Sequence, residues 1–342
     1  MIRLKDIAVR AGVSIMTVSK VLRDAPDIST ATKTRVRHLA EEMGYVPDSL
    51  ARGLRNRVSR LFGLVIPATA DPVFGRVVLA LEELAHEHGY EILLAHSLNQ
   101  PKREEEVIRR LLARRVDGLF VCPVYRLDPT APIYEELLRC GMPTVLLGHR
   151  APFCEQFASV EADDVAGSYS ATRHLLELGH KRIAFLAGLA TSPSTQERLA
   201  GYRRALQEAG VELSDELVFK AGSTIEEGEQ AALQTLREQP GITALQAVND
   251  LVAIGAANVL LNQGYKIPQD ISVVGFGNTL VSEYFRVPLT TIRQPKFRLG
   301  VAAMDLMSSL LRGEHPSSKR LTADLVRRSS TGPTPNPEPH TP

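Results

Sequence analysis

The chain is poor in cysteine and lacks a repeating glycine period. Its 342 residues include only 3 Cys, whereas 44% of them are hydrophobic. A disulfide-stapled scaffold needs denser cysteine, a collagen needs glycine at every third position, and a disordered chain contains fewer large aliphatic residues. Composition therefore excludes these three classes. It indicates a globular protein of about two domains, at roughly 150 residues per domain.

Long apolar runs are also absent. No segment approaches the roughly 18 to 20 apolar residues of a membrane span. Residues 1–6 have neither the apolar core nor the small-residue cleavage site of a signal peptide. We therefore expect a cytoplasmic protein without a membrane partner. Cys122, Cys140 and Cys154 are odd in number, and Cys122 ends an apolar run, so we expect a buried reduced thiol there rather than a disulfide or a metal ligand.

Charge is unevenly distributed along the chain. The net charge is only +1, but residues 1–60 contain 12 Lys and Arg against 6 Asp and Glu, which leaves 28 against 33 for residues 61–342. A basic segment joined to a nearly neutral body is typical of nucleic-acid binding. A solvated helical surface explains the same charge equally well.

Beyond Arg60 one pattern recurs: a helical stretch, a glycine, and then a short apolar run. Gly89, Gly179 and Gly264 each end such a helical stretch. Apolar runs of five to eight residues that alternate with helices predict parallel βαβ units. Glycine suits the left-handed position that follows a helix.

About ten strands of this kind are expected, which is more than one open sheet usually carries. We therefore predict an α/β core of two doubly wound lobes with a ligand site in the cleft between them. The pattern is interrupted at 159–164 and 287–293, where the chain is expected to cross between lobes. Lobe one is then about 60–160 and 290–320, and lobe two is about 161–289 and 321–328. Residues 329–342, rich in Ser, Thr and Pro, are predicted to be a disordered tail.

The first residues form a separate pattern of three short helices. Apolar positions predict a helix over 4–11, Gly12 turns the chain, and Ser14 can cap a second helix over 15–22. Ser29 can cap a third helix that runs to Met43. A helix pair with a glycine turn is only moderately specific, because such pairs are common in proteins that do not bind DNA.

Longer strings in this region are far more specific. They are Asp6-Ile7-Ala8, Ala11-Gly12-Val13-Ser14, Thr17-Val18-Ser19, Gly44-Tyr45-Val46-Pro47 and Ala51-Arg52-Gly53-Leu54. With them the chain resembles the lactose/galactose repressor (LacI/GalR) family of bacterial transcription regulators. Matching strings continue almost to Arg328, among them Gly179–Ala184, Arg198–Tyr202, Asn249-Asp250, Asp270–Phe276 and Pro288–Ile292.

The resemblance implies a helix-turn-helix DNA-binding domain over 1–47, a hinge helix and linker over 48–59, and a core over 60–328 like a periplasmic sugar-binding protein. It also implies a homodimer on a palindromic operator, because two heads must reach two half-sites. We expect the dimer surface on 73–85 and 93–112 of lobe one.

The second helix of such a head reads bases in the major groove. The resemblance places Ile15, Met16 and Lys20 at these positions. Ile15 and Met16 suit a thymine methyl group and Lys20 suits guanine; burial of Ile15 and Met16 in the core of the head is the alternative. Hydroxyl or charged side chains at helix starts and edges are expected to contact phosphates: Ser14, Thr17, Ser19, Arg23, Ser29 and Thr32.

A hinge helix is expected over 49–56. The resemblance makes Leu54 an apolar wedge in the minor groove, with Ala51 allowing close approach and Arg52 and Arg55 meeting the backbone or groove. Leu54 as an ordinary packing residue is the alternative. Eight residues are too few to hold a helix alone, so the hinge is expected to order only with its partner and DNA.

Polar and aromatic residues at the inner strand ends are expected to bind a small effector, a sugar or a sugar derivative. They are Asp71, Phe74, Arg126, Ser194, Arg198, Asn249, Asp250, Phe276 and Asn278. Asp71 and Asp250 have the alternative of capping helices, and Phe74 that of a core residue. Many sugar-responsive members carry aspartates where this chain has Gly148 and Gly277. We therefore hypothesise a ligand that depends less on carboxylates, namely an anionic one such as a sugar acid or a phosphorylated sugar, which faces Arg198 with little opposing negative charge.

Other functions are disfavoured by missing motifs. The chain has no Gly-x-Gly-x-x-Gly after a strand, no phosphate loop and no Gly-x-Ser-x-Gly elbow, so we expect no enzyme and no cofactor. No metal spacing is seen among the histidines, which we interpret as surface or capping residues: His86, His88, His96, His149, His174 and His180. A transport binding protein would need a signal peptide and no DNA head. A regulator answering to a partner protein or an obligatory corepressor remains the alternative.

Overall fold

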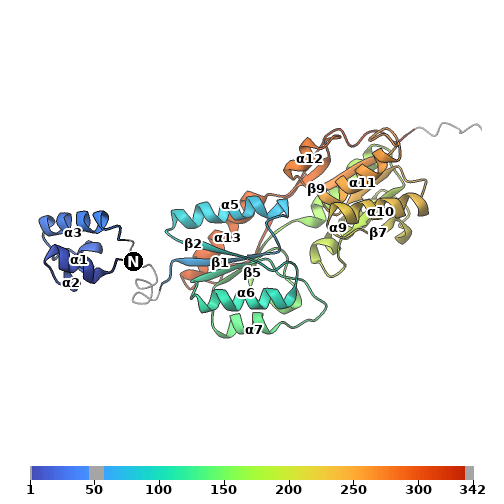
Figure 1. The fold of residues 1–342 in the computed structure, drawn as a ribbon. Coiled ribbons are helices and arrows are strands. Elements are labelled where there is room, and N and C mark those ends of the chain that lie inside the picture. The colour runs from blue at the N-terminus through green and yellow to red at the C-terminus, as the bar shows by residue number, and fades with distance from the viewer. Residues whose placement is uncertain (1, 46–57, 336–342) are drawn as a thin grey trace, which may run out of the picture. The chain divides into compact units, whose positions relative to one another are not determined.

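The computed structural model describes residues 2–45 and 58–335. Contacts divide the chain into two units, Met1–Ser59 and Arg60–Pro342. The first unit contains three described helices: α1 (Leu4–Ala11), α2 (Ile15–Leu22) and α3 (Thr30–Glu42) (Figure 1). Gly12 has a φ of +64° at the turn between α1 and α2, which is the left-handed conformation that glycine adopts without strain.

The three helices enclose a small core of their own. Ile7, Val18, Val21 and Val36 are fully buried there. These residues come from all three helices, so the apolar positions seen in the sequence converge on one centre. The predicted three-helix module is confirmed.

The second unit contains two six-stranded sheets. In lobe one the strand order is β11-β5-β4-β3-β1-β2, and every pairing in this sheet is parallel. Its strands are β1 (Leu61–Ile66), β2 (Glu91–His96), β3 (Gly118–Val121), β4 (Thr144–Leu147), β5 (Ala158–Ala162) and β11 (Lys319–Leu321). Its helices are α5 (Pro72–Glu87), α6 (Pro101–Ala113), α7 (Pro132–Arg139) and α13 (Lys296–Leu311), and a short 3-10 helix spans Pro152–Cys154.

In lobe two the strand order is β12-β10-β9-β8-β6-β7, and only β12 is antiparallel to its neighbour. Its strands are β6 (Ile183–Ala187), β7 (Val218–Lys220), β8 (Ala244–Ala247), β9 (Ser272–Gly277), β10 (Thr290–Arg293) and β12 (Asp324–Val326). Its helices are α8 (Asp164–Glu177), α9 (Pro193–Glu208), α10 (Ile225–Glu238), α11 (Asp250–Asn262) and α12 (Leu280–Tyr284), and a 3-10 helix spans Asp215–Leu217.

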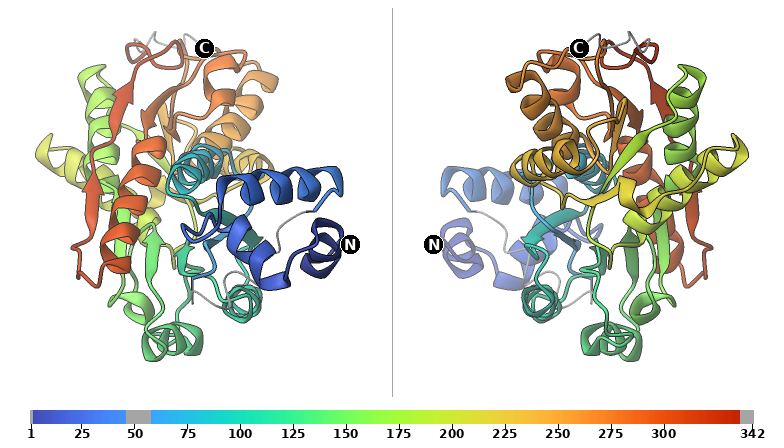
Figure 2. Two further views of the ribbon diagram at one scale, coloured as in Figure 1. Left: turned by 90° about the vertical axis from the view of Figure 1, so that its left-hand side faces the viewer. Right: turned by 90° about the vertical axis from the view of Figure 1, so that its right-hand side faces the viewer.

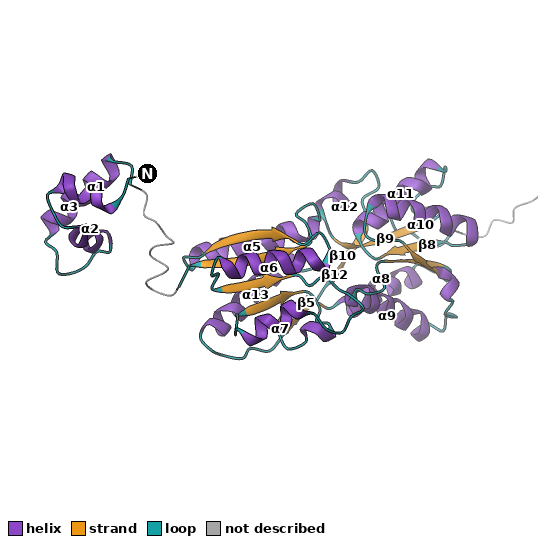
Figure 3. Cartoon of the chain, turned by 60° about the horizontal axis from the view of Figure 1, so that its bottom comes forward, coloured by secondary structure: helices purple, strands orange, loops and turns teal. Residues whose placement is uncertain are grey.

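Helices cover both faces of each sheet (Figure 3). In lobe one, α5 and α13 pack on one face around Leu81 and Met307, and α6 and α7 pack on the other around Ile108 and Tyr134. In lobe two, α10 and α11 cover one face and α8 and α9 the other. This is the doubly wound α/β arrangement that the apolar runs predict. Among the described residues, no helix is both long enough and apolar enough to traverse a bilayer.

The chain crosses between the lobes three times, after β5, after β10 and after β11. Figure 2 shows the red carboxy-terminal strands along one side of this unit. We expected residues 290–320 in lobe one, but β10 pairs with β9 in lobe two, so the crossing falls after Arg293. The segment Thr290–Arg293 lacks the continuous apolar run of the other core strands, and it forms a strand by pairing with β9 and β12.

The predicted disordered tail is wrong for residues 329–335. Ser330 is fully buried and its hydroxyl bridges lobe-two strands, donating to the Val273 carbonyl at 2.6 Å and accepting from the Thr290 amide at 2.8 Å. His174 and His180 contact Thr331 and the Gly332 carbonyl. The Ser and Thr hydroxyls that suggested disorder are hydrogen-bond partners for the edge of a packed lobe.

Candidate functional site

The first turn of α2 presents two exposed apolar side chains. Ser14 caps this helix, and its hydroxyl accepts from the Thr17 amide at 3.0 Å. Ile15 is 48% exposed and Met16 is 64% exposed, so the alternative of core burial is excluded. Val18 and Val21 on the other side of the helix fill the core instead.

Polar side chains surround this turn. Lys20 forms an ion pair with Asp27, and Arg23 donates to the Ser19 carbonyl at 2.9 Å. Ser29 caps α3, where its hydroxyl accepts from the Thr32 amide. The predicted DNA-contacting residues of the head therefore lie on α2, at its two caps and at the start of α3. The predicted hinge contacts Ala51, Arg52, Leu54 and Arg55 lie outside the described residues.

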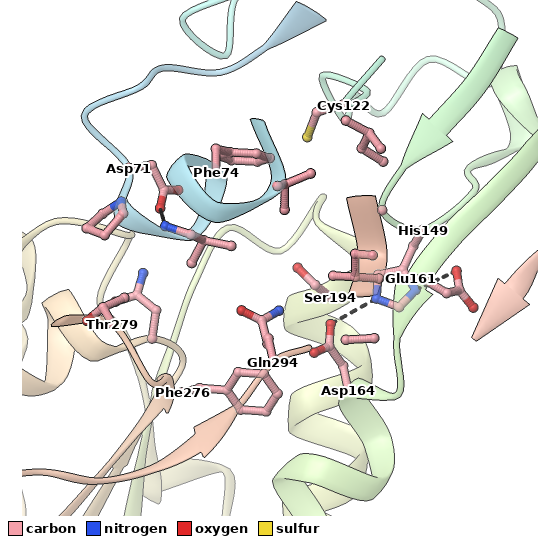
Figure 4. A pocket seen from close by; sticks show the side chains of 18 of the residues that line it. Asp71, Phe74, Cys122, His149, Glu161, Asp164, Ser194, Phe276, Thr279 and Gln294 are labelled. Atoms are coloured by element: carbon pink, nitrogen blue, oxygen red, sulfur yellow. Dashed lines mark hydrogen bonds and ion pairs between the residues drawn. The ribbon is translucent and has the colours of Figure 1, made fainter. Parts of the chain in front are cut away.

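A cavity of about 240 Å³ lies between the two lobes (Figure 4). Seven of the nine predicted effector residues line it: Asp71, Phe74, Ser194, Arg198, Asn249, Asp250 and Phe276. They lie on α5, α9, α11 and β9 or directly precede one of these elements, so both lobes contribute. The strand ends that the sequence pattern singled out therefore meet at one place.

Arg198 is the most constrained polar group of the pocket. It is 9% exposed, its Nη2 lies 3.0 Å from Asp164 Oδ1, and its Nη1 donates to the Val248 carbonyl at 2.6 Å. The guanidinium stands 3.8 Å from the ring centroid of Phe276. The Nε–H of Arg198 is buried and has no acceptor among the described residues. Arg198 lies in the second turn of α9, and its ion pair with Asp164 offsets the cost of burying its charge.

His149 forms the other charged centre. Its Nε2 lies 2.9 Å from Asp164 Oδ2, and its Nδ1 lies 3.0 Å from Glu161 Oε2 and 3.6 Å from Glu197 Oε1. Burial lowers the pKa of His149, but hydrogen bonds to Asp164 and Glu161 outweigh it and raise this pKa to about 9. We interpreted His149 as a surface or capping residue; it is 5% exposed and carries an ion-pair cluster instead.

Two more histidines also differ from that interpretation. His174 is 7% exposed and His180 is fully buried, and burial lowers the pKa of each. Both rings are buried because the ordered carboxy-terminal segment packs against them, with hydrogen bonds between Thr331 and His174 and between His180 and the Gly332 carbonyl.

The same cluster has the spacing of a cation site. Ligand atoms of His149, Asp164 and Glu197 lie within 4.8 Å of one another. Arg198 and Arg320 already pair with these carboxylates. The negative charges of Asp164 and Glu197 are therefore already neutralised by arginines of the protein. The cluster is an ion-pair network between the lobes.

Asp71 and Asp250 occupy different roles within the pocket. Asp71 caps α5, accepting from the Val73 amide at 3.0 Å, and burial raises its pKa. Asp250 does not cap α11, because Asn249 does. Its carboxylate accepts instead from the Thr279 amide at 2.7 Å and the Thr291 hydroxyl at 2.5 Å. Asp250 is 1% exposed, so it holds the ends of β9 and β10 together.

Two predicted effector residues do not line the pocket. Arg126 pairs with the buried Glu104 and stands 4.9 Å from the ring centroid of Phe153. The Asn278 amide oxygen accepts from Arg328 at 2.8 Å. Both residues follow strand ends, but local ion pairs and hydrogen bonds direct their side chains elsewhere.

Sequence reasoning missed several residues of the lining: Cys122, Tyr125, His149, Glu161, Asp164, Thr279 and Gln294. His149 follows a strand end, as the predicted residues do, so the same signal was available. Glu161 and Asp164 lie at a lobe crossing, where only the fold shows that they face the cavity. Cys122 is a free buried thiol, as expected, and burial raises its pKa.

Gly148 and Gly277, where the resemblance led us to expect aspartates in many sugar-responsive members, both have a positive φ. Gly148 has a φ of +127° and Gly277 a φ of +136°. A Cβ on Gly277 would approach Asp250 Oδ2 to 3.3 Å, and one on Gly148 would approach the Tyr125 hydroxyl to 3.1 Å. Side chains at these positions would therefore be strained, and Tyr125 and Asp250 occupy the neighbouring space.

Family models match both units. Residues 3–48 match a model described as bacterial regulatory proteins, lacI family. Residues 59–329 match a model of periplasmic binding proteins and the sugar binding domain of the LacI family.

Relatives match over nearly the full length. The transcriptional repressor CytR of Escherichia coli (strain K12) is 33% identical over 330 residues, with 96% of each chain covered. The lac repressor dimer bound to operator and the anti-inducer ONPF has a TM-score of 0.86 at 30% identity, covering 97% of this chain and 99% of that one. The regulator CelR in complex with cellobiose has a TM-score of 0.74 at 30% identity, covering 96% and 100%.

Proposed function

The chain belongs to the LacI/GalR family of bacterial transcription regulators, and we propose that a small ligand in its inter-lobe pocket controls how tightly its amino-terminal unit binds an operator. It is a DNA-binding regulator with an effector-binding core, not an enzyme. We further propose that it acts as a repressor and that a metabolite controls its affinity for the operator.

The observation that carries the DNA-reading step is the exposure of Ile15 and Met16 at the amino-terminal turn of α2. Large apolar side chains that are exposed on a folded unit often mark a surface that a partner covers. The major groove offers thymine methyl groups for this purpose. We infer that Ser14, Thr17, Ser19, Arg23, Ser29 and Thr32 meet phosphates around them, and that Lys20 exchanges Asp27 for a base or a phosphate.

We infer a homodimer, because the similar lac repressor is a dimer when it is bound to its operator. Lobe one supports this, because Leu79 on α5 is 47% exposed and Leu94 on the edge strand β2 is 41% exposed. Pairing of these faces would bring two hinge segments together. Leu54 of each is then proposed to enter the central base step, with Ala51, Arg52 and Arg55 beside it.

The pocket favours a neutral polyhydroxyl ligand. Four carboxylates line it, Asp71, Glu161, Asp164 and Asp250, against the cations His149 and Arg198. Our hypothesis of an anionic ligand required little opposing charge near Arg198, and the 3.0 Å ion pair with Asp164 contradicts that premise.

Several groups of the lining are suited to such a ligand. Carboxylates accept from sugar hydroxyls, and the unpartnered Nε–H of Arg198 can donate to one. Phe74 is a half-buried aromatic of the lining, whereas Arg198 covers the Phe276 ring. The cavity of about 240 Å³ is below the roughly 300 to 1,000 Å³ of drug-sized sites, which suggests a ligand near monosaccharide size.

The operator-binding step is tested by retaining fragmented genomic DNA on the purified protein and sequencing it. Wild type is expected to enrich a palindrome with a flexible central step. The double variant Ile15→Ala/Met16→Ala and the single variant Leu54→Ala are expected to lose that enrichment. Val9→Ala, an exposed apolar residue of α1, is the matched control. Equal enrichment in all variants would contradict the assigned contacts. Enrichment by wild type only after addition of cell metabolites would point to an obligatory corepressor.

The effector is tested by calorimetric titration with neutral sugars and sugar acids. We expect saturable binding of a neutral sugar that Phe74→Ala weakens about two- to tenfold, because contacts on an aromatic face contribute about 0.5 to 1.5 kcal/mol. Tight binding of sugar acids alone would overturn the preference for a neutral ligand.

A further inference from the structure

A second cavity of about 450 Å³ lies beside the inter-lobe pocket. Lobe one supplies the start of α5 and of α13, and lobe two supplies α12, the loop before it and the end of β10. Pro72, Thr279 and Gln294 line both cavities and therefore form a shared wall. The second cavity contains only one of the predicted effector residues, Asn278.

Positive charge dominates this cavity. Its lining includes the four cations Arg76, Arg293, Lys296 and Arg298 and a single carboxylate, Glu283. Glu283 is engaged elsewhere, since its Oε2 lies 3.3 Å from Arg328 Nη2. Within the residues that the structure describes, Arg76, Arg293 and Arg298 form no ion pair at all. Three exposed arginines thus line one cavity, and none of them has an ion-pair partner among the described residues.

Backbone donors add to this charge. α13 begins at Lys296 behind Pro295, which has no side-chain group to cap the helix. The amides of Phe297 and Arg298 in its first turn have no acceptor among the described residues. An uncapped helix start carries a partial positive charge and free N–H groups, both of which favour anions.

Lys296 is held in place behind these groups. It is 9% exposed and its Nζ donates to the carbonyls of Gly277 at 2.5 Å and Asn278 at 2.9 Å. Burial lowers the pKa of Lys296, and the charges of Arg76 and Arg293 lower it further, whereas the carboxylates of Asp250 and Asp71 raise it. A bound anion would offset the repulsion from the two arginines.

We propose that this cavity is a second ligand site, separate from the effector pocket, which binds a multivalent oxyanion, most simply a phosphoryl group. Guanidinium groups bind phosphate oxygens through paired, charge-assisted hydrogen bonds. Arg76 and Arg298 reach the anion from lobe one and Arg293 from lobe two. The anion therefore bridges the lobes and favours the arrangement in which these cations converge, which couples it to any ligand in the adjoining pocket.

The test is calorimetric titration of the full-length protein with inorganic pyrophosphate at low ionic strength. Wild type is expected to bind one pyrophosphate per chain. Arg293→Gln and Arg76→Gln are each expected to weaken binding about tenfold or more, since each removes charge-assisted hydrogen bonds. Arg139→Gln, an exposed arginine on α7 without an ion pair in the described structure, is expected to leave binding unchanged. Circular dichroism checks that each variant is folded.

Absence of saturable binding to wild type, or equal binding by wild type and Arg293→Gln, would overturn the proposal. The second result would place the anion elsewhere, for example at Arg198. A parallel titration with a phosphoserine peptide identifies the source of the group. Stronger binding of pyrophosphate assigns the site to small phosphorylated molecules, and stronger binding of the peptide assigns it to a modified protein segment; both results retain the oxyanion site.

Discussion

His149 Nε2 lies 2.9 Å from Asp164 Oδ2, and this contact joins the end of a lobe-one strand to the first turn of a lobe-two helix. The opposite oxygen of Asp164 meets Arg198 at 3.0 Å. One buried carboxylate therefore receives two cations, one from each lobe. Because all three residues line the pocket, a ligand that displaces either cation would change the contact between the lobes.

Protonation of His149 is expected to make stability depend on pH. Its pKa is raised from 6.5 to about 9 in the folded protein. The stabilisation is therefore complete below pH 6.5 and is lost as the pH rises through 9, with a magnitude of up to about 3 kcal/mol. We expect the thermal unfolding midpoint of wild type to fall between pH 6.5 and 9.5, and the fall to be smaller in His149→Asn. His86→Asn, at an exposed histidine of α5, should keep the wild-type slope; identical slopes for all three proteins would refute the assignment.

Removal of the Arg198 charge is expected to destabilise lobe two. Arg198→Met leaves Asp164 with only His149 as a counter-charge and removes the hydrogen bond to Val248. The expected loss in the free energy of unfolding is about 3 kcal/mol, measured by urea denaturation at pH 7. Arg198→Lys retains the charge but loses the second hydrogen bond, so its loss should be smaller. A methionine variant as stable as wild type would show that the ion pair contributes nothing to stability.

Release of Lys20 is expected to strengthen DNA binding. Asp27 pairs with Lys20 in the absence of DNA, and this contact lowers the pKa of Asp27. Asp27→Asn removes both the competing carboxylate and a negative charge near the phosphates, so affinity for an enriched operator should rise several-fold in a fluorescence anisotropy titration. Glu41→Gln, an exposed carboxylate of α3 without an ion pair in the described part of the chain, is the matched control. An equal rise in DNA affinity in both variants would show that the effect comes from the change in net charge and not from the release of Lys20.

Ser330 is expected to be a structural residue of lobe two. Ser330→Ala leaves the Thr290 amide and the Val273 carbonyl without this partner in a buried site. Leaving buried polar groups unsatisfied costs about 1 to 3 kcal/mol each. Thermal unfolding should therefore show a clear decrease for Ser330→Ala and almost none for Ser329→Ala, whose exposed hydroxyl makes only a 3.4 Å contact. An unchanged midpoint in Ser330→Ala would contradict the role of this segment.

The sequence by itself determined the repeating elements. Periodic apolar residues and the serine caps at Ser14 and Ser29 predict α2 and α3 at their observed starts, because these signals act within one or two turns. Continuous apolar runs predict buried parallel strands for the same local reason. Strand ends such as Asn249 predict pocket residues, since parallel strands end at one edge of a sheet.

Only the tertiary structure decided which charges meet. Arg198, Asp164 and His149 come from different elements, and no local pattern shows that the chain crossing after β5 brings them within 3.0 Å of one another. The same holds for Thr290–Arg293 and for Ser330, whose polar composition suggests loop or disorder until β9 supplies their hydrogen-bond partners. Ion pairs and strand edges depend on long-range neighbours, and the three crossings between the lobes set those neighbours.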